Sequence, residues 1–160
     1  MLKKFKFSLL VIAFAMFIGL FVSCAPQPSD AASIYGTWKS NYGDGYTITE
    51  TTITYDDGEP YTADWGNGGI YGFTGEILDI SNSSNGYIFF RYTILEEGIE
   101  EEYKGKYFAI HFKNLTEKSI ELANAYKAGG KEYCTTLEDA KKEFTVENGY
   151  YGLFGEYVRN

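Results

Sequence analysis

The 160-residue sequence contains few of the side chains on which catalytic and metal sites depend. It has one histidine, two cysteines and three prolines. With His111 as the single histidine, a zinc site made of several histidines is excluded, and a Ser-His-Asp triad would have to use this one residue. The acidic run at 96–102 lacks the ligand spacing of a calcium loop, so no metal and no cofactor is predicted. We therefore expect a protein that is not an enzyme.

The one long hydrophobic run lies at the N-terminus. Lys3, Lys4 and Lys6 precede an apolar stretch at 7–22, which stops at Ser23-Cys24-Ala25-Pro26. A basic segment, an apolar segment and a small residue before a cleavage point are typical of a secretory signal peptide. The run is shorter than the roughly 20 apolar residues that a membrane-spanning helix needs. The sequence predicts a signal peptide at residues 1–23 that is cut away.

Cys24 distinguishes this signal from an ordinary one, because it stands where a second small residue would be. The segment resembles the lipobox at which bacterial lipoproteins are cleaved and diacylated, and Phe21-Val22-Ser23 is similar to the relaxed boxes of spirochaete lipoproteins. The resemblance implies a lipoprotein with palmitate or a similar acyl chain on Cys24, held to the bacterial outer membrane and facing the cell surface or the periplasm. Outer-membrane placement is expected because Ala25, not Asp, follows the cysteine. The alternative is an ordinary signal that leaves Cys24 as a free thiol.

Positive charge is scarce. The chain has 14 Lys and Arg against 22 Asp and Glu, a formal net charge of −8, and loss of Lys3, Lys4 and Lys6 reduces 14 to 11 and gives −11. That charge repels phosphate backbones and anionic lipid headgroups. Nucleic acid is therefore excluded as a partner, and we expect the acyl anchor at Cys24, not a basic patch, to contact the membrane.

Acylation of Cys24 would exclude an intrachain disulfide. If Cys24 is acylated, only Cys134 is left, although exported proteins often use disulfides. Cys134 is interpreted as a partly buried cysteine, with a reactive thiol as the alternative.

The remaining chain has the pattern of an antiparallel β-protein. Residues 24–33 form an acylated cysteine and a small, polar, proline-bearing tether, and 34–160 form one domain. In that domain apolar residues alternate with polar ones and Tyr, Phe, Ile and Thr dominate. Predicted strands cover 35–40, 46–49, 52–55, 61–65, 71–80, 86–95, 107–113, 119–126 and 153–159.

One segment has a helical pattern. Thr135 or Thr136 is placed to cap it, and Leu137, Ala140 and Phe144 share one face. The sequence thus predicts an all-β fold: an antiparallel up-and-down barrel of about eight strands with one short helix before the last strand.

Tyr35-Gly36-Thr37-Trp38-Lys39 carries a family resemblance. Gly-x-Trp on the first strand of a β-rich domain resembles the lipocalin or calycin signature, and its position after a lipobox and tether is similar to that of spirochaete or Bacteroides lipocalin-like lipoproteins. The resemblance implies that Trp38 closes one end of the barrel and that an arginine near the end of the last strand, here Arg159, covers its ring. Gly36, Trp38 and Arg159 would then form a structural barrel floor. The alternative is that Trp38 is an ordinary core aromatic.

Two functions are compatible with these features. The leading hypothesis is a membrane-anchored barrel that binds a small apolar ligand in a cavity lined by Tyr46, Tyr55, Phe90 and Phe112. The alternative is a surface protein-interaction lipoprotein with a filled barrel, such as an adhesin, a host-factor binder or a protease inhibitor. The interior volume of the folded domain distinguishes the two.

Overall fold

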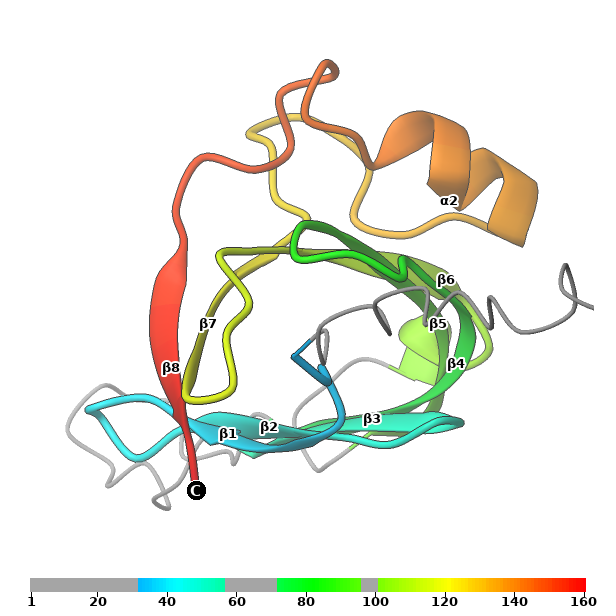
Figure 1. Cartoon of the computed structure of the whole chain (residues 1–160). Helices are drawn as coiled ribbons and strands as arrows, with labels where there is room; N and C mark the ends of the chain where they lie inside the picture. Colours follow the sequence, from blue (N-terminus) through cyan, green and yellow to red (C-terminus); the bar gives the residue numbers. More distant parts are fainter. Residues whose placement is uncertain (1–31, 57–71, 96–100) are drawn as a thin grey trace, which may run out of the picture. The chain divides into compact units, whose positions relative to one another are not determined.

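The structure is a computed structural model that describes residues 32–56, 72–95 and 101–160, and it confirms the predicted fold class. Eight antiparallel strands follow one another around a closed barrel, and the last pairs with the first (Figure 1). The strands are β1 (Gly36–Lys39), β2 (Gly45–Ile48), β3 (Thr52–Asp56), β4 (Phe73–Ile80), β5 (Gly86–Leu95), β6 (Tyr107–Lys113), β7 (Ser119–Asn124) and β8 (Gly155–Arg159). A 3-10 turn, η2 (Glu101–Tyr103), precedes β6, and α2 (Leu137–Glu143) precedes β8.

Alternation along each strand separates a core face from an outer face. In β6 the buried residues Phe108, Ile110 and Phe112 alternate with Tyr107, Ala109 and His111, as the sequence predicts. Most of the buried apolar residues belong to one hydrophobic cluster, to which residues outside the strands, such as Phe144 and Tyr150, also contribute.

Several predicted strands are longer in the sequence pattern than in the structure, and the last two show why. β7 ends at Asn124, because Tyr126 is 75% exposed and its N–H donates to the carbonyl of Tyr150 instead of continuing the sheet. β8 begins at Gly155, since Leu153 is 91% exposed. The predicted strand at 61–65 lies outside the described residues.

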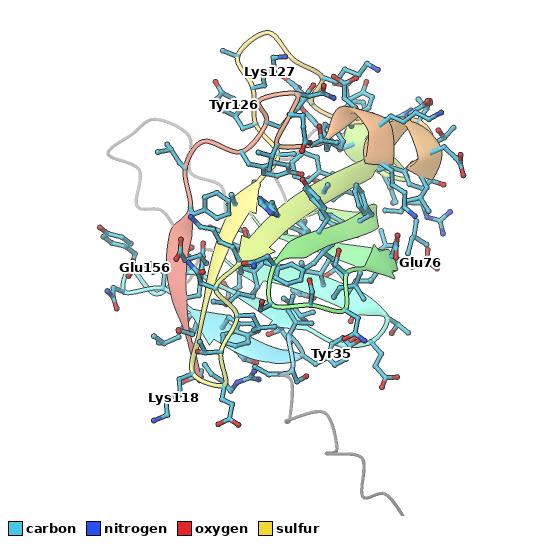
Figure 2. All side chains as sticks on the ribbon, turned by 45° about the horizontal axis from the view of Figure 1, so that its top comes forward. Tyr35, Glu76, Lys118, Tyr126, Lys127 and Glu156 are labelled. Carbon is cyan, nitrogen blue, oxygen red and sulfur yellow. The ribbon has the colours of Figure 1, made fainter. Side chains whose placement is uncertain are left out.

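The two ends of the barrel carry different connections. The end where β1 begins and β8 ends is called the floor end; it also holds the β2–β3, β4–β5 and β6–β7 turns. The other end is called the loop end; it holds the β1–β2 loop and the β5–β6 and β7–β8 connections. Figure 2 shows Tyr126 and Lys127 at the loop end and Tyr35 and Lys118 at the floor end.

The α2 segment adds a second layer outside the barrel, against β5 and β6 (Figure 1). The helix begins where the Thr136 side chain accepts a hydrogen bond from the N–H of Asp139, and its buried residue is Ala140. Phe89, on the outer face of β5, is only 8% exposed. This layer explains why β5 is apolar on both faces, since both faces are covered. No helix in the described part of the chain is long and apolar enough to span a membrane.

Candidate functional site

The floor end is closed by the indole of Trp38 and the guanidinium of Arg159. Trp38 is fully buried, and its indole N–H donates a 2.8 Å hydrogen bond to the carbonyl oxygen of Ile34. The guanidinium carbon of Arg159 lies 4.1 Å from the centre of the indole ring, which is within cation–π range. The two residues are opposite each other in the β1–β8 pairing. The β8 register therefore determines that the arginine meets the ring.

Arg159 also connects separate parts of the floor through its N–H groups. Nε donates to the carbonyl of Glu117 at 2.7 Å, Nη1 donates to the carbonyl of Tyr35 at 2.7 Å, and Nη2 donates to the carbonyl of Ser33. One side chain thus links the segment before β1 to the β6–β7 turn. Sequence reasoning could not identify these acceptors, because a backbone carbonyl is present at every position.

Gly36 lies directly under this arginine. Its φ is +143°, and a Cβ placed there would lie 2.4 Å from Nη1 of Arg159. Any larger residue would both strain the backbone and displace the guanidinium. The structure therefore brings together Gly36, Trp38 and Arg159, the three residues named for the floor from the sequence.

The side chains named for a ligand cavity lie in the packed interior. Tyr46, Phe90 and Phe112 are at most 2% exposed. The rings of Tyr46 and Tyr55 are 4.8 Å apart, and Phe90 stacks on Phe73 at 5.2 Å with an interplanar angle of 5°. These distances are those of rings in direct contact. Tyr46, Phe90 and Phe112 therefore belong to the buried core, and Tyr55, which is partly buried, packs against it.

The carboxylate of Asp44 is a shared hydrogen-bond acceptor that the sequence analysis did not predict. Its carboxylate accepts hydrogen bonds from the hydroxyl groups of Ser40, Tyr55 (3.2 Å) and Tyr157 (3.3 Å) at the loop end of the barrel. Burial, followed by the charge of Asp44, raises the pKa of Tyr157. The Asp-Gly pair is fully explained by turn chemistry in the sequence, and only the fold shows which hydroxyl groups converge on it.

His111 lies on the face of β6 opposite Phe108, Ile110 and Phe112, among other aromatic rings. Its ring stacks on Tyr87 at 4.7 Å and contacts Tyr151 at 5.1 Å and Phe154 at 5.3 Å. Among the described residues, its buried Nδ1 has no hydrogen-bond partner. Burial and, to a lesser extent, Lys113 lower the pKa of His111. The imidazole therefore packs as an aromatic ring. This arrangement favours a structural role for His111 over a role in proton transfer.

Cys134 is buried and only 4% exposed. Its backbone N–H and carbonyl exchange two 2.9 Å hydrogen bonds with Tyr107. Burial raises the pKa of the Cys134 thiol, so the reactive thiolate is disfavoured at neutral pH. Cys24, the predicted acylation site, lies outside the described residues.

Three large side chains stand out at the loop end because they are almost fully exposed. Tyr42 is 92% exposed, Leu153 91% and Tyr126 75%. Tyr42 follows β1, Tyr126 follows β7 and Leu153 precedes β8, and these three strands are neighbours in the barrel. Large apolar side chains exposed at one end of a domain are candidates for contact with another protein. We call Tyr42, Tyr126 and Leu153 the exposed loop-end side chains.

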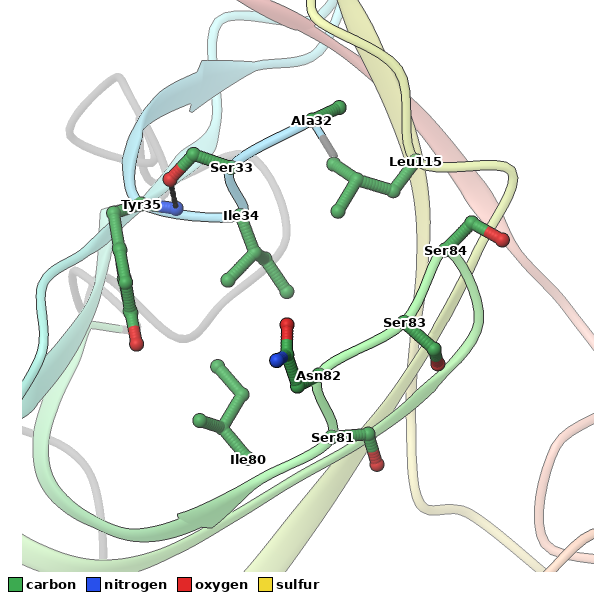
Figure 3. Close-up of a pocket in the computed structure, with 10 residues that line it drawn as sticks. All are labelled: Ala32, Ser33, Ile34, Tyr35, Ile80, Ser81, Asn82, Ser83, Ser84 and Leu115. Atoms are coloured by element: carbon green, nitrogen blue, oxygen red, sulfur yellow. Dashed lines mark hydrogen bonds between the residues drawn. The ribbon is translucent and has the colours of Figure 1, made fainter. Parts of the chain in front are cut away.

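A hollow of about 340 Å³ lies at the floor end. Figure 3 shows it between the segment that leads into β1, the β4–β5 turn and Leu115. Ile34, Ile80 and Leu115 supply its apolar walls, and the side chain of Asn82 points toward Ile34. None of the four predicted cavity residues lines this hollow.

In the described ranges, no group of three or more His, Cys, Asp and Glu side chains is placed to hold a metal ion. Comparison of the chain with protein-family models, with curated proteins and with solved structures finds no match. Inferences about function therefore depend on the chain's own residues and geometry.

Proposed function

We propose that this protein is a lipid-anchored, non-catalytic lipoprotein whose barrel acts by binding another protein at the loop end. The observation that carries the proposal is the burial of side chains named for the cavity: Tyr46, Phe90 and Phe112 are at most 2% exposed and belong to the hydrophobic cluster. A barrel packed in this way has its binding capacity on its outer surface. The packing supports the protein-interaction hypothesis over the apolar-ligand hypothesis.

The position of the exposed loop-end side chains supports the same proposal. The described chain enters β1 at the floor end. Tyr42, Tyr126 and Leu153 lie at the opposite end, where a partner would be met. Tyrosine is enriched at protein interfaces, since its ring provides apolar area and its hydroxyl group a hydrogen bond.

Kinship with lipocalins is part of the proposal. It is supported by the closed eight-strand barrel and by the Arg159 guanidinium that covers Trp38. In this interpretation Gly36, Trp38 and Arg159 hold the floor and take no part in binding. The non-catalytic assignment is supported by the raised pKa of Cys134 and by the aromatic surroundings of His111.

The anchor is tested by metabolic labelling with a palmitate analogue in a bacterium that processes lipoproteins. We expect label and membrane association for the wild type and loss of both in Cys24→Ser. Cys134→Ser is the matched control, because it removes the other cysteine and should leave labelling unchanged. Equal labelling of wild type and Cys24→Ser would contradict the anchor.

The binding surface is tested by site-specific photocrosslinking on intact cells of the source organism and on the surfaces it contacts. A photoreactive side chain at position 42, 126 or 153 should give the same discrete adduct, whereas one at Thr47, an exposed residue of the barrel wall, should give none. Adducts from all four positions alike, or from none, would contradict a specific partner at the loop end.

A further inference from the structure

The chain just before β8 is attached to the barrel wall through side chains. No backbone N–H or carbonyl of residues 151–154 makes a hydrogen bond within the part of the chain that the structure describes. Gly152 and Leu153 in this segment are exposed. A segment without backbone hydrogen bonds opens more easily than the strands beside it. What holds residues 151–154 in place is therefore the packing of Tyr151 and Phe154.

Both of these side chains pack on His111. The centre of the His111 ring lies 5.1 Å from that of Tyr151 and 5.3 Å from that of Phe154. On its other side the imidazole stacks on Tyr87 of β5 at 4.7 Å. The hydroxyl group of Tyr151 also donates a 3.3 Å hydrogen bond to the carbonyl of Phe144. His111 is thus the side chain of the barrel wall that contacts both ends of the segment.

A proton on the imidazole would disturb this packing. The Nδ1 atom of His111 is buried and has no hydrogen-bond partner among the described residues. The imidazolium form carries an N–H at this atom, and a buried donor without an acceptor is most costly when the group is charged. Aromatic rings attract a cation, but the Lys113 ammonium already lies 4.0 Å from the centre of the Phe154 ring. Opening the segment gives Nδ1 access to water and relieves this cost.

Other titratable side chains surround His111 on every element packed against it. They are Tyr87 on β5, Lys113 on β6, Glu121 on β7, where it pairs with Lys113 at 2.9 Å, and Glu147 and Tyr151 on the β7–β8 connection. Burial, followed by the charge of Lys113, lowers the pKa of His111, and Glu147 opposes this effect. Burial raises the pKa of Tyr151, which stays neutral. His111 therefore gains its proton in the folded protein only below its ordinary pKa of about 6.5.

We propose that His111 is a pH-operated latch, which holds residues 151–154 on the barrel wall when neutral and releases them when protonated, while the barrel stays closed. Tyr150 limits the release on one side. It is fully buried, and its hydroxyl group accepts the N–H of Lys131 at 2.8 Å and donates to the carboxylate of Glu143 at 2.7 Å. The pairing of β8 with β1 and β7 limits it on the other side.

Nuclear Overhauser contacts between ring protons test the latch in the purified full chain, without a partner. At pH 7.5 the His111 ring should show contacts to Tyr151 and Phe154. Titration to pH 4.5 should remove both contacts, with the midpoint at which the His111 ring protons shift. The ratio of released to held segment should rise about tenfold per pH unit, as binding of one proton requires. The contact between Phe144 and Tyr150, 5.1 Å apart, should persist throughout.

Three variants assign the effect to His111. His111→Phe keeps an aromatic ring that cannot be protonated, so residue 111 should keep its contacts to Tyr151 and Phe154 at pH 4.5. Glu147→Gln removes the charge that raises the pKa of His111, so the midpoint of release should move to lower pH. Glu50→Gln makes the same change in the exposed β2–β3 turn and should leave the midpoint unchanged.

Four results would overturn the latch. Both contacts could persist although His111 is protonated, or His111 could stay neutral down to pH 4.5. The contacts could be lost equally in His111→Phe. Finally, the contact between Phe144 and Tyr150 could disappear at the same midpoint, which would indicate that the whole loop end unfolds.

The effect on binding rests on the proposed function, because Leu153, one of the exposed loop-end side chains, lies in the released segment. Photocrosslinking at positions 42 and 153 should give adducts from both at pH 7.5, and only the adduct from position 153 should decrease at pH 4.5. Unchanged adducts from both positions would overturn a role of the latch in binding. Absence of adducts at either pH would contradict the loop-end partner, whereas the contacts of His111 test the latch itself.

Discussion

Arg159 supports the floor through the shape of its side chain as well as its charge. Three carbonyl groups accept hydrogen bonds from it while its plane lies on the Trp38 ring. A lysine ammonium is compact and cannot reproduce a planar group with several fixed donors. Arg159→Lys should therefore lose most of the floor contacts although the charge is kept.

We predict that Arg159→Lys lowers the free energy of unfolding by about 2 kcal/mol, the usual effect of losing hydrogen bonds from a charged group. Urea denaturation followed by circular dichroism measures it. Arg91→Lys is the control, because Arg91 forms a partly exposed ion pair with Glu76 and should change stability by less than about 0.5 kcal/mol. Equal decreases in the free energy of unfolding in the two variants would contradict a specific role of Arg159 in the floor.

Gly36 is predicted to be required for both its backbone and its space. Gly36→Ala should destabilise the protein by about 3 kcal/mol, because strain at positive φ adds to the collision with Arg159. Gly43→Ala provides a matched control: its φ is +93°, but nothing lies within 4 Å of a Cβ there, so only strain of about 1 kcal/mol is expected. Thermal or urea unfolding compares them. Similar losses at both positions would mean that the contact with Arg159 contributes nothing.

Some residue contacts could be predicted from the sequence and others could not. The pairing of Trp38 with Arg159 was expected from the resemblance to the lipocalin signature, which implies that an arginine near the end of the last strand covers the tryptophan ring. Asp44 could not be identified as a shared acceptor, since Tyr55 and Tyr157 are 11 and 113 residues away from it. Hydrogen bonds over such separations depend on strand register, which one sequence does not specify.

At the scale of elements, α2 has one defined cap. The sequence left Thr135 and Thr136 as alternatives, and the structure shows that the Thr136 hydroxyl receives the N–H of Asp139. Thr136→Ala should cost about 1 kcal/mol, and Thr135→Ala should have an effect below about 0.5 kcal/mol. Urea unfolding distinguishes them, and a larger loss at position 135 would contradict the cap assignment.

The burial of His111 among aromatic rings should make the free energy of unfolding depend on pH. Burial, with Lys113, lowers the pKa of His111 in the folded protein, partly offset by Glu147, whereas the unfolded chain has the ordinary value of about 6.5. As the pH falls below about 6.5, His111 therefore becomes protonated in the unfolded chain before it does so in the folded protein. The contribution of His111 to stability is complete above about pH 6.5 and is lost as the pH falls toward the lowered value.

His111→Phe keeps an aromatic ring beside Tyr87 and Tyr151 and removes the titrating group. We predict that the melting temperature falls less between pH 7.5 and pH 5.5 in this variant than in the wild type. Carboxylates titrate equally in both proteins, so the difference isolates His111. Identical pH dependence in the two proteins would show that protonation of His111 does not destabilise the folded state.

Strand positions were more predictable than strand ends. Alternation in β6 and the two apolar faces of β5 are local features of the sequence, and the structure reproduces them. The end of β7 was predicted two residues too late and the start of β8 two residues too early. Tyr126 and Leu153 fit the strand pattern in the sequence, although both are exposed outside the sheet in the structure. Their exposure is set by the path of the β7–β8 connection, which residue type does not reveal.

For the whole molecule, the number of strands and the closure of the barrel followed from regular spacing and from the paired ends of the chain. The state of the interior did not follow from the sequence. Tyr55, Phe73 and Phe90 come from three strands, and their rings meet in a continuous series at 5.9 Å and 5.2 Å. An aromatic-rich barrel can hold a ligand or hold its own rings, and only side-chain packing distinguishes these cases.

The filled interior is tested most directly by the melting temperature of the mature domain, residues 25–160, with and without lipid extracts from bacterial and host membranes. A ligand that binds the folded state at about 100 times its dissociation constant adds about 2.7 kcal/mol to stability, which corresponds to a rise of roughly 5 °C or more. We predict no rise, because Tyr46, Tyr55, Phe90 and Phe112 occupy the space. A reproducible rise of that size, abolished by Phe90→Ala, would contradict the filled barrel and favour a lipid-binding protein.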